Sequence, residues 1–156
     1  AGSPPMPKDL NIRHILVLVD GTDSAARAVE LAANLARALR ARLTGLHVIE
    51  LETLHQLLSA NVLTPAEMED FEGGLKESGN RHLDAARKVA HGHGVTLEAV
   101  SVTGNSELVV PREVESRGVD LLVIGAFDSS QVRFELLFRQ RQQVLDHAPC
   151  PVLVAR

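Results

Sequence analysis

The sequence is poor in aromatic residues and contains a single cysteine. Phe, Trp and Tyr make up 3% of its 156 residues, and neither Trp nor Tyr occurs. Aliphatic side chains and alanine must therefore build the core, which is more typical of a helix-covered parallel sheet than of an antiparallel sandwich. Cys150 alone cannot form an internal disulfide, so we expect a small buried apolar residue there and a cytoplasmic location by default.

A basic excess and a long apolar run are also lacking. The formal net charge is −4, whereas a nucleic-acid-binding protein needs a basic face to neutralise phosphates. No apolar segment approaches the roughly 18 residues expected of a transmembrane helix. We therefore expect neither nucleic acid nor membrane as a partner. The first residues are small and rich in proline, so we expect a flexible lead-in over residues 1–12 and a single domain over residues 13–156.

What the chain does contain is a regular alternation of short apolar runs with segments of helical periodicity. The runs occupy residues 15–19, 46–49, 95–102, 119–125 and 152–155. Runs of this length that are apolar on both faces are typical of strands in a parallel sheet. The alternation predicts an α/β fold, a five-stranded parallel doubly wound (Rossmann-like) sheet with helices on both faces.

The longest predicted helix has a clear start signal. Thr64 can cap it, Pro65 takes the first helical position, and Glu67 stands three residues after the threonine. The helix should run towards residue 90, but Gly73 and Gly74 interrupt it and predict a break or a bend. The preceding segment, residues 51–61, is amphipathic and is predicted to be helical.

Ligands of doubly wound sheets bind outside the carboxyl ends of the strands, where the strand order reverses. We expect the first and fourth strands to flank that point, which would place Asp20, Gly21 and Thr22 on one lip of a cleft and Gly125 on the other. Asp20 could contact a ligand there or cap the helix that follows, and both roles are open. The sequence therefore predicts the functional site at this edge.

Three stretches of the sequence resemble the universal stress protein family. They are VDGTDSA at residues 19–25, VDLLVIG at 119–125 and, most specifically, HAPCPVLV at 147–154. The resemblance covers residues 13–156 and implies a cytoplasmic, homodimeric α/β protein of the stress response. It further implies adenine packing at Val48, an apolar strand residue that is core by default, and a dimer interface formed by the C-terminal strand through Val152, Leu153 and Val154.

The nucleotide-binding members of that family carry glycine, two residues, glycine, nine residues, and then glycine with serine or threonine. Counted back from HAPCPVLV, these positions fall on Gly125, Asp128, Phe138 and Arg139. A carboxylate at Asp128 would repel a phosphate charge by about 4 kcal/mol at ~4 Å and an effective dielectric of roughly 20, and Phe138 adds bulk where bare backbone is needed. We expect no required cofactor. ATP or AMP is disfavoured, with a rearranged phosphate site as the alternative.

Three of the four phenylalanines cluster in this same segment. Phe127, Phe134 and Phe138 lie within twelve residues of one another. Two interpretations are open: they belong to the core, or they plug the vacated phosphate site or form a patch that binds a protein partner.

No pattern in the sequence indicates catalysis or a metal site. His82, His91 and His93 lack a third ligand fixed by spacing, so we interpret them as solvated histidines near a helix end. No nucleophile stands with a base and an orienting acid. The sequence thus predicts a dimeric binding or adaptor module and not an enzyme. A distant alternative is an adenylating or ATP-hydrolysing enzyme, because the turn at residues 20–24 faintly resembles the glycine-rich loop of ATP pyrophosphatases.

Overall fold

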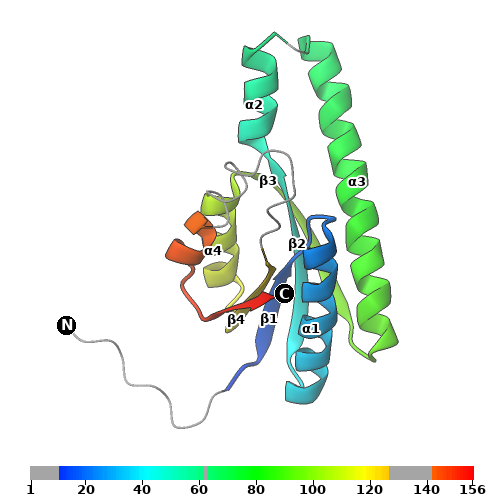
Figure 1. Ribbon diagram of the computed structural model, residues 1–156, viewed down its shortest axis with the longest axis vertical. Helices are drawn as coiled ribbons and strands as arrows, with labels where there is room; N and C mark the ends of the chain where they lie inside the picture. Colours follow the sequence, from blue (N-terminus) through cyan, green and yellow to red (C-terminus); the bar gives the residue numbers. More distant parts are fainter. Residues whose placement is uncertain (1–10, 62, 127–141) are drawn as a thin grey trace, which may run out of the picture.

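We describe the fold from a computed structural model, in which residues 11–61, 63–126 and 142–156 are described (Figure 1). The elements are β1 (His14–Leu18), α1 (Asp23–Leu39), β2 (Arg42–Glu50), α2 (Leu51–Ser59), α3 (Pro65–Gly92), β3 (Leu97–Gly104), α4 (Ser106–Ser116), β4 (Leu121–Gly125) and β5 (Val152–Ala155). Residues 142–147 form a further short helical segment. The predicted lead-in lies outside the described residues except for residues 11 and 12.

The strands form one parallel sheet in the order β3-β2-β1-β4-β5. The chain builds outwards from β1 to β3 and then returns to the other side of β1 with β4. The order therefore reverses between β1 and β4, as predicted. Helices α1 and α3 pack on one face of the sheet, and α4 packs on the other with residues 142–147 (Figure 1). The predicted five-stranded, Rossmann-like α/β fold is confirmed.

The core has two halves, one on each face of the sheet. On β1, Ile15 and Val17 pack in the half that contains α1 and α3, whereas Leu16 packs in the half that contains α4. This division follows from the strand period of two, which sends alternate side chains to opposite faces. No aromatic side chain enters either half within the described part of the chain. Aliphatic side chains and alanine supply the packing there, in agreement with the composition.

Helix α1 lies against the sheet through small residues. Ala28, Ala32 and Ala36 are fully buried, whereas the side chain of Leu35 is only half-buried and that of Leu39 is 44% exposed. The larger leucines recur at helical spacing, but they lie at the flank of the contact. An alanine face lets the helix axis approach the sheet closely, and the leucine side chains then reach over its edge.

Helix α3 differs from its prediction in one respect. Thr64 caps it as expected, since its Oγ1 accepts a hydrogen bond from the Glu67 backbone N–H at 3.2 Å. However, α3 runs without a break for 28 residues, so the break or bend predicted at Gly73 and Gly74 is wrong. Each glycine costs about 1 kcal/mol relative to alanine in a helix interior. That cost is too small to interrupt a helix whose second half is held by packing on the sheet.

Two helices extend beyond the carboxyl end of the sheet. The amphipathic segment predicted to be helical forms α2, which begins directly after β2. It stands beside the first half of α3 above the sheet (Figure 1). Within the described ranges, no helix combines the length and the apolar character needed to cross a membrane.

Candidate functional site

The structure brings the two predicted lips of the cleft together. Strands β1 and β4 are direct neighbours, with Val17 opposite Val123 in the register. The segments that follow them therefore leave the sheet at the same edge. This places the turn that contains Asp20, Gly21 and Thr22 beside Gly125, which confirms the expected arrangement of the chain.

The turn after β1 is ordered by its own polar side chains. The Asp20 carboxylate oxygen Oδ1 accepts hydrogen bonds from the Thr22 backbone N–H at 3.0 Å and from Thr22 Oγ1 at 2.6 Å. Thr22 in turn caps α1, because its Oγ1 accepts a hydrogen bond from the Ala25 N–H at 3.1 Å. The helix cap is thus Thr22, and Asp20 orients that cap. The Asp20 side chain is exposed at the edge of the sheet.

Gly125 is required by packing at its position. A Cβ there would lie 2.5 Å from the carbonyl carbon of Ser24 and 2.7 Å from the backbone nitrogen of Ala25. Both atoms belong to the main chain at the start of α1, so no side-chain rotation can make room. Gly125 therefore has a structural cause that is independent of phosphate.

Helix α3 contributes a side chain to this edge that the sequence analysis misplaced. His82 was interpreted as a solvated residue near a helix end, but its half-buried ring lies directly over Gly21, where a Cβ would be 2.5 Å from His82 Nε2. The same nitrogen is 3.3 Å from Ser78 Oγ. Gly21 has a φ of +80°, in the left-handed region that favours glycine. Only the tertiary contact between α3 and the turn reveals that His82 packs over Gly21.

A second contact fixes α3 over the ends of β1 and β2. Gly79 is buried, and its backbone packs against the ring of His47 at a distance that leaves no space for a Cβ. His47 Nδ1 lies 2.7 Å from the Val19 carbonyl oxygen. The adjacent Val48 points to the opposite face, where it is half-buried and packs with the core beneath α4.

The other two histidines near the end of α3 lie away from this edge. His93 Nε2 lies within hydrogen-bond distance of Glu30 Oε2, at 2.6 Å, and His91 is exposed. Throughout the described ranges, no group of three or more His, Cys, Asp or Glu side chains is placed to hold a metal ion.

A carboxylate at the end of β2 is a feature that the sequence analysis missed. Glu50 accepts hydrogen bonds from the backbone N–H and the hydroxyl of Ser106, the first residue of α4. It thereby supplies the N-terminal interaction that Asn105, at the cap position, does not provide. Desolvation by burial raises the pKa of the Glu50 carboxyl, although the hydrogen bonds from Ser106 act in the opposite direction.

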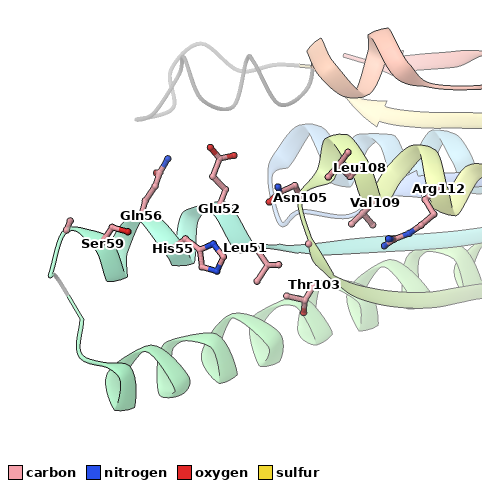
Figure 2. A pocket seen from close by; sticks show the side chains of 12 residues that line it. Leu51, Glu52, His55, Gln56, Ser59, Thr103, Asn105, Leu108, Val109 and Arg112 are labelled. Carbon is pink, nitrogen blue, oxygen red and sulfur yellow. The ribbon is translucent and has the colours of Figure 1, made fainter.

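A cleft of about 750 Å³ opens beside Glu50, between α2, the end of β3 and α4 (Figure 2). Its lining includes Leu51, His55, Leu108 and Arg112. A smaller cavity of about 160 Å³ lies between α1 and α3, and His82 is one of the residues that line it. The larger cleft contains none of the residues predicted to contact a nucleotide, so it is separate from the edge between β1 and β4.

The residues predicted to form a dimer interface lie on an edge strand. Strand β5 pairs with β4 at one end of the sheet order. Leu153 is 36% exposed and Val154 44% exposed, whereas Val152 is half-buried against the core beneath α4. Cys150 is half-buried as well, and burial raises the pKa of its thiol.

Several predicted positions cannot be placed in the site. Phe127, Phe134 and Phe138, and the motif positions Asp128 and Arg139, lie outside the described residues. Their predicted roles stay predictions.

The strand order, and the turn and glycine at its reversal, define a doubly wound α/β protein of the class that binds ligands at the carboxyl edge of the sheet. The family model of the universal stress protein family matches residues 11–156. This chain belongs to the universal stress protein family, which confirms the resemblance seen in the sequence.

Two similar proteins match this chain along nearly their whole length. Universal stress protein YxiE of Bacillus subtilis is 28% identical over 144 residues, which cover 91% of this chain and 97% of that protein. A solved structure of a universal stress family protein from Burkholderia pseudomallei is 25% identical, with a TM-score of 0.71 and coverage of 95% of this chain and 98% of that one.

Some solved structures of similar fold contain a nucleotide. A family protein from Arabidopsis thaliana with AMP bound is 22% identical, with a TM-score of 0.62 and coverage of 92% of this chain and 90% of that one. Two others, 22% and 16% identical, were solved with cAMP and with dAMP. At these identities the likeness establishes the shared fold.

Proposed function

We propose that this protein acts in the cytoplasm as a homodimeric binding or adaptor module of the stress response, without catalysis and without the glycine-based phosphate site. The observation that carries the proposal is the packing of Gly125 against the backbone of α1. It explains why a glycine stands there in a chain that departs from the rest of the phosphate-binding pattern. The remaining motif positions carry Asp128, Phe138 and Arg139, which suit phosphate poorly.

The homodimer is supported by the position of β5, which is an edge strand of the sheet formed by the described residues. An edge strand presents unpaired backbone groups, and proteins cover such edges or pair them. Leu153 and Val154 add apolar surface to this edge on its two faces. Because a twofold axis brings the same patch of two copies together, β5 with these side chains can cover itself.

Analytical ultracentrifugation at micromolar concentration tests the dimer. The unchanged protein should sediment as a dimer, and Val154→Glu should shift it to the monomer, since a carboxylate would have to be buried in the contact. Leu39→Glu is the matched control, because Leu39 is equally exposed, at 44%, but lies at the end of α1. A monomeric unchanged protein would overturn this part of the proposal.

A second candidate is a nucleotide-responsive protein that binds AMP or ATP at the edge between β1 and β4. It is favoured by the exposed Asp20 carboxylate at that edge and by the nucleotide complexes of proteins with this fold. Asp20, Gly21, Thr22, Val48 and Gly125 would form the site, with rearranged phosphate contacts.

Isothermal titration calorimetry separates the two candidates. We expect no binding of magnesium-ATP, ADP, AMP or cAMP at micromolar concentrations. Micromolar affinity that is lost in Asp20→Ala but retained in Asp23→Ala, an exposed acidic residue of the same turn, would establish the nucleotide-binding alternative. Nucleotide turnover that disappears in Asp20→Ala would instead establish an enzyme.

A further inference from the structure

The cleft between α2 and α4 has two helical walls that face each other (Figure 2). From α4 come Leu108, Val109 and Arg112, whose spacing of one and three residues places them on one face of the helix, and Asn105 precedes them at the cap position. From α2 comes a row that includes Leu51 and His55, one turn apart. The volume of about 750 Å³ falls within the range of roughly 300–1,000 Å³ of small-molecule sites.

One part of this cleft is apolar and open to solvent. Leu108 is 66% exposed, the highest value among the large apolar side chains of the described chain. The half-buried Leu51 continues the apolar surface into the cleft, and the buried Val109 packs behind it as a lining residue. A ligand with an apolar body would remove the Leu108 side chain from water, which is favourable in proportion to the area covered.

The other part of the cleft offers a positive charge. Arg112 follows Leu108 by one turn, and its guanidinium makes no hydrogen bond or ion pair with the residues that the structure describes. Figure 2 shows its side chain and that of His55 extending towards the space between the two helices. Among the described residues that line the cleft, Glu52 is the one carboxylate, and it extends to a different side of α2 from His55 (Figure 2).

A carboxylate of the chain itself limits the charge that a ligand can carry. The N-terminus of α4 is the natural anion site of this region, but Glu50 already occupies it through its hydrogen bonds to Ser106. A polyphosphate placed there would be repelled. Arg112 lies nearly two turns further along α4, so a single negative charge beside its guanidinium avoids the carboxylate.

We propose that this cleft binds a small organic monoanion with an apolar body, of the chemical class of a medium-chain carboxylate. The anionic group pairs with Arg112 and the apolar body covers Leu108 and Leu51. The cleft shares no lining residue with the edge between β1 and β4, so this site is distinct from any nucleotide site.

Fluorescence of 8-anilinonaphthalene-1-sulfonate, a monoanion with an apolar body, tests the proposal, with decanoate as the competitor. The unchanged protein should bind the probe saturably and release it to decanoate but not to AMP. Arg112→Gln and Leu108→Ser should each weaken decanoate binding about tenfold, the loss of one charge-assisted hydrogen bond or of one apolar contact of similar size.

The matched controls are Arg37→Gln and Leu39→Ser, which change exposed residues of α1 outside the cleft and should leave decanoate binding unchanged. Circular dichroism confirms that each variant is folded. The proposal is overturned by an absence of saturable binding, by unchanged affinity in both cleft variants, or by an equal loss in the controls. Displacement of the probe by AMP would show that the probe binds at the edge between β1 and β4, and this result would overturn the proposal as well.

Discussion

Replacing Gly125 with alanine should destabilise the fold, although the change adds a single methyl group. The new Cβ would lie 2.5 Å from the Ser24 carbonyl carbon and 2.7 Å from the Ala25 nitrogen. Because carbon atoms pack favourably at about 3.5–4.0 Å, β4 and α1 would have to separate by about 1 Å. The φ of Gly125 is not positive, so an alanine backbone is allowed there and the collision alone should set the effect.

The expected magnitude follows from two opposing effects. Overpacking of a well-packed core costs about 1–3 kcal/mol, and the upper end applies here because main-chain atoms must move. Alanine also has less conformational freedom than glycine in the unfolded chain, and this effect offsets about 0.4–1 kcal/mol of the overpacking cost. We therefore expect Gly125→Ala to lower the free energy of unfolding by about 2 kcal/mol, a substantial part of the roughly 5–15 kcal/mol typical of native proteins.

Urea unfolding followed by far-UV circular dichroism measures this change. All variants are compared at one protein concentration, because self-association would add to the apparent stability. Gly73→Ala is the control: apart from its chain neighbours and the backbone of its own helix, no atom lies within 4 Å of its Cβ position in α3, so it should leave stability unchanged or raise it by up to about 1 kcal/mol. A Gly125→Ala protein as stable as the unchanged one would refute the packing argument.

Three further predictions concern other contacts of the site. Gly79→Ala should lower the free energy of unfolding because its Cβ would overlap the His47 ring, and His47→Ala should recover part of that loss; strictly additive effects in the double-mutant cycle would contradict the contact. Burial raises the pKa of the Glu50 carboxyl above its ordinary 4.5. The protonated carboxyl therefore contributes to stability below pH 4.5, and this contribution is lost as the pH rises through the pKa of the folded state. In urea titrations, Glu50→Gln should therefore gain stability relative to the unchanged protein as the pH rises above 4.5, and a relative loss would show the opposite shift. Thr22→Ala should lower the free energy of unfolding by about 1 kcal/mol, because the cap of α1 is lost. Thr22→Ser keeps the hydroxyl and should retain most of that stability. An equal loss in both variants would show that the hydroxyl does not act as the cap.

The order and type of the elements could be predicted from local patterns. Strand β5 was predicted at its observed bounds, because an apolar run after a proline is a strong local signal. Strand β2 was predicted over residues 46–49 but begins at Arg42. Its first half contains Thr44 and Gly45, which interrupt the apolar pattern. Pairing with β1 extends the strand, and Thr44 Oγ1 is satisfied there by the ring of His14 at 2.7 Å.

The arrangement of the chain at the edge between β1 and β4 could be predicted, because the rules for parallel sheets determine where the strand order reverses. They place Asp20 and Gly125 together without knowledge of any side-chain contact. The ring of His82 over Gly21, and the Glu50 carboxylate at the start of α4, could not be predicted, since they join residues about 56–61 positions apart in the chain.

The sequence by itself thus determined which segments become strands and helices and at which edge of the sheet they turn, because periodicity, caps and glycines act over a few neighbouring residues. Only the tertiary structure decided that Gly125 must be a glycine, that α3 continues through Gly73 and Gly74, and that Leu108 and Arg112 line a cleft with α2. These outcomes depend on how closely separate elements approach each other. That distance is set by the packing of the whole core and not by any local preference of the chain.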